Sequence, residues 1–259
     1  GGDNTQWFPN STSNGNGKNG GAIQVTQTAG TLYVGALPLN YEYYYAYNPY
    51  NSGILAVSSG GAGAQYAAYR GYWGSGGRGG DVTVSVSQGA SIVLLGDQGL
   101  TAPTGASPVA INGITAWSNG GAGGYSWSQG DGNTEQRWDV GNGGNGGIVT
   151  VNFDGSITNS GTYGSPGSLI GLQRGIVAAS TGGANCGTLN LSSCGDVIEN
   201  SPKAGLPGNV NVTLTQHSNI SLTGGSAVGV TALAIAGSSY SNPIDTYYGA
   251  ALSTVSITA

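Results

Sequence analysis

The chain is poor in charge and in histidine, and each shortage removes a class of function. Of its 259 residues only six are Lys or Arg, 11 are Asp or Glu and one is His, which gives a net charge of −5. Six cations spread along the chain form no basic stripe, so we expect no nucleic-acid partner. With one His and no second pair of cysteines the chain does not fit a structural zinc site, and we expect no metal and no cofactor.

Long apolar runs are also missing. No run approaches the roughly 18 residues that a membrane-spanning helix needs, so we expect no membrane insertion of this fragment. The N-terminus lacks the basic and apolar segments of a secretory signal peptide. The chain begins at Gly1 and contains no Met, which we interpret as a mature or excised piece of a longer precursor.

Cysteine is nearly absent too. The two cysteines, Cys186 and Cys194, lie eight positions apart in a polar segment. This spacing permits a small disulfide loop, which would indicate an oxidising compartment. Two free thiols are the alternative.

Glycine is the residue that the chain has in excess. It contains 51 glycines without a Gly-X-Y period, which excludes collagen. The glycines lie between short β-type runs, and hydrophobic residues still make up 38% of the chain. We therefore predict that the glycines form turns, where they supply positive φ without steric cost.

A three-part pattern returns four times. An alternating strand follows a glycine-rich run at 22–25, 81–84, 148–151 and 209–212. A second apolar patch follows at 31–34, 91–94, 155–157 and 219–222, and a third element at 53–56, 113–116, 175–178 and 229–232. A fixed order of short strands at a recurring spacing is typical of a stacked architecture. The pattern predicts an all-β fold with almost no helix, an elongated right-handed parallel β-helix, or β-solenoid.

The repeat also predicts the domain organisation. We expect a lead-in over residues 1–18 and one solenoid domain over 19–259. The domain would hold repeats at 19–78, 79–145, 146–207 and 208–251, and part of a fifth. A small residue recurs in the third element, which suits a tight corner of the coil; these residues are Ala56, Ala116, Ala178 and Ala232.

Aromatic residues gather in the loops of the first two repeats. They are Tyr41, Tyr43, Tyr44, Tyr45, Tyr47 and Tyr50 in one loop, Tyr66, Tyr69, Tyr72 and Trp73 in the next, and Tyr125, Trp127 and Trp138 in a third. Repeat insertions usually map to one face of a solenoid, so these loops could form one patch. Tyr and Trp dominate binding hot spots and can stack on sugars. The alternative is that they shield apolar edges of the solenoid.

The order of the repeat motifs resembles that of bacterial autotransporter passenger domains. The closest copy runs from Gly-Gly-Ile-Val-Thr-Val at 146–151, through Gly-Ser-Ile at 155–157, to Gly-Ile-Val-Ala-Ala-Ser at 175–180. The resemblance covers most of residues 19–236, and it implies a secreted β-helix, extracellular or on the surface of a Gram-negative bacterium. The chain departs from the family because it contains no outer-membrane barrel and its aromatic loops are longer.

Catalytic groups are few. The densest acidic cluster is Asp131, Glu135 and Asp139, with Arg137 among them, in a glycine-rich loop where we expect a solvated segment rather than a catalytic pair. The lone histidine, His217, is expected to alternate with its neighbours in a strand and not to catalyse. Residues 76–81 match one calcium-binding nonapeptide unit, but such units bind calcium in tandem and this one stands alone. We expect no enzyme.

The sequence therefore favours a secreted cell-surface module with a structural or adhesive role. It would bind through the Tyr/Trp loops, either to itself or to a protein or glycan on a host or neighbouring cell. The alternative is a self-assembling extracellular filament or matrix subunit that stacks end to end, because both ends of a solenoid expose strand edges.

Overall fold

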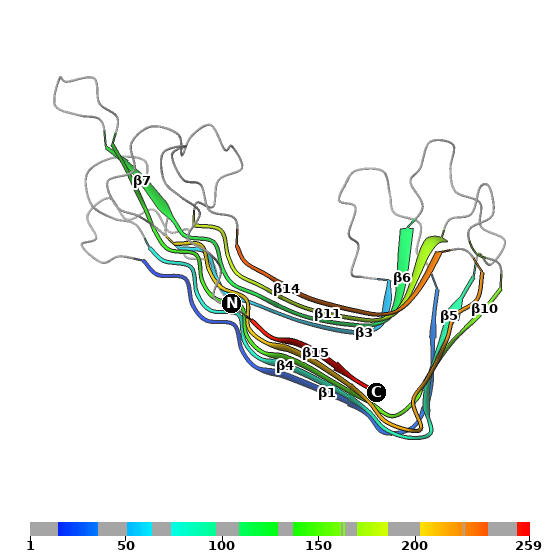
Figure 1. Cartoon of the computed structure of the whole chain (residues 1–259). Coiled ribbons are helices and arrows are strands. Elements are labelled where there is room, and N and C mark those ends of the chain that lie inside the picture. The colour runs from blue at the N-terminus through cyan, green and yellow to red at the C-terminus, as the bar shows by residue number, and fades with distance from the viewer. Residues whose placement is uncertain are drawn as a thin grey trace, which may run out of the picture.

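The computed structural model describes residues 15–35, 51–63, 74–96, 109–128, 137–161, 163, 170–185, 203–224, 226–237 and 253–259. Every regular element in this part of the chain is a β-strand (Figure 1). Thirteen of the fifteen strands follow the predicted repeat, including the partial fifth one, and the other two form a hairpin. The strands of coil 1 are β1 (Ile23–Gln27), β2 (Gly30–Val34) and β3 (Ser52–Ser59). Coil 2 holds β4 (Val82–Val86), β5 (Ala90–Leu95) and β6 (Val109–Asn119).

Two further coils and a hairpin complete the described part. Coil 3 holds β9 (Val149–Phe153), β10 (Ser156–Ser160) and β11 (Ile170–Thr181). Coil 4 holds β12 (Val210–Leu214), β13 (Asn219–Ser221) and β14 (Ser226–Ile235), and β15 (Val255–Thr258) follows it. The hairpin of β7 (Tyr125–Ser128) and β8 (Arg137–Val140) lies between coils 2 and 3 in the chain.

Equivalent strands of successive coils pair in parallel and build three sheets. Sheet A contains β1, β4, β9, β12 and β15, sheet B contains β2, β5, β10 and β13, and sheet C contains β3, β6, β11 and β14. The register matches the sequence repeat, since Ile23 pairs with Val82, Val82 with Val149, and Val149 with Val210. The predicted all-β fold of stacked parallel strands is therefore confirmed.

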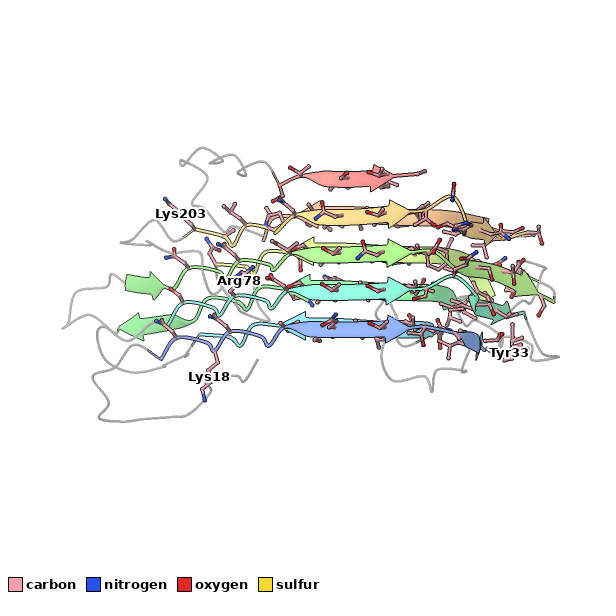
Figure 2. The ribbon with its side chains drawn as sticks, turned by 90° about the horizontal axis from the view of Figure 1, so that it is seen from below. Lys18, Tyr33, Arg78 and Lys203 are labelled. Atoms are coloured by element: carbon pink, nitrogen blue, oxygen red, sulfur yellow. The ribbon has the colours of Figure 1, made fainter. Side chains whose placement is uncertain are left out.

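The stack is short for a solenoid. One repeat makes one complete coil, so the five strands of sheet A span four spacings of about 4.8 Å, or about 19 Å. The longest strand, β11, has 12 residues and at about 3.3 Å per residue is about 40 Å long. The long dimension thus lies along the strands, not along the stacking axis as in the elongated solenoid we expected (Figure 2).

The core lies between the three sheets, where alternate residues of each strand stack from coil to coil. Fully buried side chains include those of Val82, Ile92, Ile114 and Phe153. The recurring alanines face this core in the middle of sheet C, since Ala56, Ala116 and Ala178 are at most 1% exposed. The prediction that they form corners is wrong, because a strand in sheet C continues past each of them.

The glycine-rich segments extend the coil beyond sheets A and C. Four of them lead into sheet A (15–22, 74–81, 141–148 and 203–209), and four continue from sheet C (60–63, 120–124, 182–185 and 236–237). We call these eight segments together the glycine wall. In Figure 1 they run side by side at the end of the coil that is opposite sheet B and next to β7.

Candidate functional site

The glycine wall is held together by backbone hydrogen bonds in two directions. Within the segments that lead into sheet A, the N–H of Gly17 donates to the Ser75 carbonyl at 2.8 Å, and Gly76 repeats this bond to Asn142 one coil further on. Across the wall, the bonds alternate between the two sets of segments and form one series. Each N–H donates to the carbonyl of the residue before it in this series: Lys18, Gly61, Gly77, Gly121, Gly144, Gly183, Gly205 and Gly237.

The two sets of segments approach so closely that only glycine fits between them. A Cβ built on Gly60 would lie 1.9 Å from the carbonyl oxygen of Gly77, and one on Gly120 would lie 1.8 Å from that of Gly144. Glycines recur every third residue, which is the period of an extended polyproline II-type chain. The prediction that these glycines form turns is wrong, because the wall is extended and its packing excludes side chains.

Positive φ occurs elsewhere. The described glycines with positive φ are Gly30, Gly89, Gly161 and Gly224, and none of them belongs to the wall. Gly30 is the first residue of β2 and pairs with Ala90, and Gly89 directly precedes Ala90 at the same junction of sheets A and B. The turn chemistry that we expected of glycine in general is confined to these few positions.

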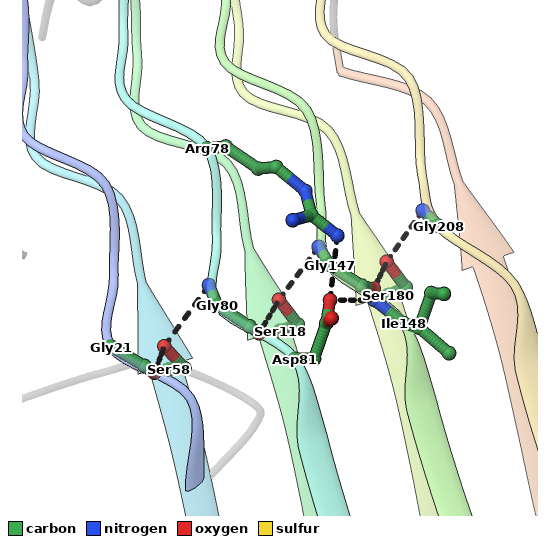
Figure 3. Close-up of polar contacts among 10 residues, drawn as sticks. All are labelled: Gly21, Ser58, Arg78, Gly80, Asp81, Ser118, Gly147, Ile148, Ser180 and Gly208. Carbon is green, nitrogen blue, oxygen red and sulfur yellow. Dashed lines mark hydrogen bonds and ion pairs between the residues drawn. The ribbon is translucent and has the colours of Figure 1, made fainter.

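Three buried serines join sheet C to the wall (Figure 3). The Ser118 hydroxyl donates to the Gly80 carbonyl at 2.8 Å and accepts from the Gly147 N–H at 2.8 Å, so it bridges two coils. Ser58 and Ser180 do the same, from Gly21 to Gly80 and from Gly147 to Gly208. We call these three residues the serine ladder. They supply the hydrogen bonds that the wall glycines at these positions cannot form with each other.

Polar side chains hold the outer side of the wall. Asn16 and Asn142 each accept, through Oδ1, the backbone N–H of the residue stacked on the next coil, at 2.8 Å. Asp81 does the same for the Ile148 N–H at 2.9 Å, and it also pairs with Arg78 at 2.6 Å (Figure 3). The Asp81 carboxylate, at the end of the calcium-like sequence, therefore already binds the backbone of the next coil and Arg78.

The wall also contains residues at which loops begin and end. We call the residues that flank a loop its roots. Residues 64–73 leave the wall at Gly63 and return at Gly74, and the β7–β8 hairpin leaves at Gly124 and returns at Gly141. These roots bond to one another, because the Gly124 N–H donates to the Gly74 carbonyl and the Gly141 N–H donates to the Gly124 carbonyl, both at 2.8 Å. Coil 3 joins them through a bond from Gly123 to Ala184, just before residues 186–202.

The remaining aromatic loop starts at a different place. Residues 36–50 connect β2 to β3, so their roots at Gly35 and Asn51 lie at the junction of sheets B and C. Sheet C separates this junction from the wall (Figure 1). The roots therefore do not support a single patch that includes all three aromatic groups, whereas the second and third groups arise from one cluster of roots.

Most of the predicted binding residues lie outside the described part of the chain. This applies to the following aromatic residues and to both cysteines: Tyr41, Tyr43, Tyr44, Tyr45, Tyr47, Tyr50, Tyr66, Tyr69, Tyr72, Trp73, Cys186 and Cys194. The other three are on the hairpin, where the backbone register places Trp127 opposite Trp138 and Tyr125 opposite Val140.

The lone histidine lies in the turn between β12 and β13, not in a strand as we expected. Its Nδ1 is 3.2 Å from Oδ1 of Asp154, and both side chains are partly exposed to solvent. A hydrogen bond from the Thr215 hydroxyl is the main cause that lowers the pKa of Asp154. Desolvation is the second largest effect and opposes it, and the contact with His217 lowers the pKa further. Among the described residues, the hydrogen-bond partner of His217 Nε2 is the Gln216 side chain, so this cluster connects the turn to Asp154.

Other chemistry is sparse in the residues that the structure describes. Among them no group of three His, Cys, Asp or Glu side chains is arranged to hold a metal ion. Asp131 and Glu135 of the acidic cluster lie outside the described residues, and Asp139 is on β8. None of the described segments forms a helix that is long and apolar enough to cross a membrane.

Comparisons with protein-family models, with curated proteins and with solved structures found no match.

The sequence pattern held a signal for the wall and the ladder that the turn interpretation missed. In coils 2 and 3 the wall reads as one outward residue followed by two glycines, as in Asn142-Gly143-Gly144. The ladder serine always stands two residues after the buried alanine of sheet C and two before the first wall glycine, as in Ala116, Ser118 and Gly120. A triplet period beside a strand period of two indicates two different extended structures in one coil.

Proposed function

We propose that the protein is a secreted, surface-displayed binding module, and that its contact surface is formed by the loops that arise from the glycine wall. The observation that carries this proposal is the shared cluster of loop roots at Gly63, Gly74, Gly124 and Gly141. These roots are fixed by hydrogen bonds within the wall and between coils. A rigid scaffold that fixes several loops at one edge is the usual arrangement of a binding surface.

The composition of these loops supports a binding role. The four segments that follow the wall are 64–73, 125–140, 186–202 and 238–252, and they hold Tyr66, Tyr69, Tyr72, Trp73, Tyr125, Trp127, Trp138, Tyr240, Tyr247 and Tyr248. Large aromatic side chains supply contact area at a low cost in conformational entropy, as in antibody loops.

The net charge of these four segments indicates which kind of partner they would favour. The same four segments contain six acidic residues and two basic ones, so six minus two leaves four of the five net negative charges of the chain. The acids are Asp131, Glu135, Asp139, Asp196, Glu199 and Asp245, and the bases are Arg70 and Arg137. We propose that the partner is a protein or glycan on another cell that offers apolar groups beside positive charge.

The architecture fits this role as part of the same proposal. We propose that the coil is a right-handed β-helix, since parallel crossovers within one sheet are right-handed in about 98% of cases. The repeat order that resembles autotransporter passengers supports an extracellular location. The scarcity of carboxylate pairs and the absence of a nucleophile at His217 among the described residues support binding rather than catalysis.

The test compares two groups of aromatic residues, in loops whose roots lie on opposite sides of sheet C. The wall-edge variant combines Tyr72→Ser, Trp73→Ser and Trp127→Ser, and the control variant combines Tyr44→Ser and Tyr45→Ser in the loop between sheets B and C. Labelled protein is titrated against intact Gram-negative cells and against a glycan array. We expect wild type and the control to bind, and the wall-edge variant to bind at least about tenfold more weakly, which is the loss of one hot-spot residue.

Far-UV circular dichroism must show the same β-signal for all three proteins. The proposal is contradicted if the wall-edge variant binds as wild type does, or if the control variant is the one that loses binding. Absence of binding by wild type to both probes would also count against it.

A further inference from the structure

Coil 4 differs from the coils below it at the positions through which the glycine wall passes from one coil to the next. In the register of the strand pairs, Ala236 stands where Gly60, Gly120 and Gly182 stand in coils 1 to 3. Pro207 stands where Gly20, Gly79 and Gly146 stand, and Ala234 stands where the serine ladder would continue. The three changes affect three separate contacts.

Ala236 removes the space for another wall segment. A Cβ built on Gly60, Gly120 or Gly182 would lie 1.8 to 1.9 Å from a carbonyl oxygen of the next coil, at Gly77, Gly144 and Gly205 respectively. Distances this short cannot be accommodated, and the atom that would be hit is backbone. Ala236 carries this Cβ, so a fifth wall segment cannot occupy the equivalent place above coil 4.

Pro207 and Ala234 remove hydrogen bonds. The N–H groups of Gly20, Gly79 and Gly146 each donate to the carbonyl of the coil above at 2.8 Å. Proline has no N–H, so this bond ends at coil 4. Ala234 has no hydroxyl, so the bridge that Ser180 makes between Gly147 and Gly208 has no counterpart one coil higher.

The residues before β15 also indicate that the glycine wall ends at coil 4. The pairing of Val210 with Val255 places Ser253 at the position of Gly208, and Leu252 precedes Ser253 in the sequence. Coils 2 and 3 have two glycines there. β15 therefore adds a fifth strand to sheet A without the glycine pair that the wall requires.

We propose that coil 4 is a built-in cap, which ends the glycine wall and prevents a second copy of the chain from stacking on this end. Coil 1 carries none of these changes, because Gly20, Gly60 and Ser58 stand at the three equivalent positions. A stack needs both ends, so the protein forms separate particles rather than end-to-end filaments. This inference does not depend on what the loops bind.

Gly21 gives a probe for stacking that leaves the single particle intact. A Cβ on Gly80, Gly147 or Gly208 would lie 2.2 to 2.5 Å from a carbonyl oxygen of the coil below, whereas a Cβ on Gly21 meets nothing within 4 Å. In a stacked assembly the Gly21 position would face the coil of the neighbouring copy. Gly21→Ala therefore blocks in-register stacking without a clash inside one copy.

The experiment has an assembly arm and a stability arm. Sedimentation velocity of wild type and Gly21→Ala over a wide range of concentration is expected to show one monomeric species for both. A larger species in wild type that disappears in Gly21→Ala would overturn the proposal. A larger species that persists unchanged in Gly21→Ala does not use the coil 1 end, so it is not the stacking of coil 1 on coil 4 that the cap is proposed to prevent, and it agrees with the cap.

The stability arm uses the cap residues themselves. Ala236→Gly and Pro207→Gly are expected not to raise the midpoint of urea unfolding, because the wall is proposed to end at coil 4. The described contact above Pro207 is with Ser253, whose hydroxyl donates to the Pro207 carbonyl at 2.7 Å, and neither substitution removes it. The matched changes one coil lower, Gly182→Ala and Gly146→Pro, are expected to lower it strongly. A higher midpoint for Ala236→Gly or Pro207→Gly would show that a wall segment does lie above coil 4, and would overturn the proposal.

Discussion

Ser118→Ala tests the idea that the serine ladder, rather than the glycine wall alone, holds sheet C to the wall. The hydroxyl of Ser118 is fully buried and makes two bonds of 2.8 Å, one to the Gly80 carbonyl and one from the Gly147 N–H. Alanine fits the site sterically, since Ala234 occupies the equivalent position in coil 4. The substitution therefore removes the two bonds and changes little else.

The magnitude follows from the two backbone groups that are left behind. Both glycines are buried, and a buried donor or acceptor without a partner costs about 1–3 kcal/mol. Two such groups predict a loss of about 2–6 kcal/mol in the free energy of unfolding. This would be a large fraction of the stability of a typical domain, which is about 5–15 kcal/mol.

The control is the same chemical change on the outer face of sheet A. Ser85 lies on β4 between buried Val84 and Val86, and its side chain points away from the core. Ser85→Ala is expected to change the free energy of unfolding by less than about 0.5 kcal/mol. Both variants are compared with wild type by urea unfolding at equilibrium, with the m-value monitored because a stacked fold can unfold in stages.

A loss for Ser118→Ala no greater than that for Ser85→Ala would refute the reasoning. It would mean that water or a backbone shift satisfies Gly80 and Gly147 without the hydroxyl. A loss accompanied by a lower m-value would show that part of the stack has separated.

Three further predictions use other parts of the structure. Gly80→Ala is expected to lower the urea midpoint sharply and Gly21→Ala to leave it nearly unchanged, because the added Cβ would lie 2.2 Å from a carbonyl oxygen in the first case and touch nothing in the second. Equal midpoints would contradict this. Thr215→Val is expected to raise the pKa of Asp154 towards its ordinary value, observed by NMR titration of the carboxyl. Because the pKa of Asp154 is lowered in the folded state, the Asp154 carboxylate stabilises the fold above its ordinary pKa, and this stabilisation is lost as the pH falls through the lowered pKa. Acid unfolding of the Thr215→Val variant should therefore begin at a higher pH than that of wild type. Phe153→Ala is expected to cost about 3–5 kcal/mol in the free energy of unfolding, since the ring is fully buried, and a cost below about 1 kcal/mol would contradict the core assignment.

The strands could be predicted from the sequence because a strand in this fold is local and periodic. Val82, Val84 and Val86 alternate with Thr83 and Ser85, and this alternation fixes both the strand and its inward face. The spacing between repeats then fixes which strands pair, as the partners of Val82 show. Register is well specified here because a slip of one residue would expose the whole apolar face.

The wall could not be predicted in the same way, since its cause is not local. Gly121 is required because the carbonyl of Gly61, sixty positions earlier, lies where a side chain would be. A glycine in a turn and a glycine between two packed backbones look alike in a sequence that is met alone. Only the period of three distinguishes them, because turns do not repeat every third residue.

The binding surface that we propose for the loops depends on the same distinction between glycines in turns and glycines between packed backbones. If the glycines formed turns, every loop would begin at its own corner and the aromatic groups would be independent of one another. In an extended wall, the roots at Gly74, Gly124 and Gly141 are joined by successive hydrogen bonds, so loops of different coils begin from one fixed edge. A fixed origin lowers the entropy that the loops lose on binding, which is the cost that most limits the affinity of loop surfaces. The excess of glycine thus supports the proposed binding role through the rigidity that close packing of backbones provides, not through flexibility.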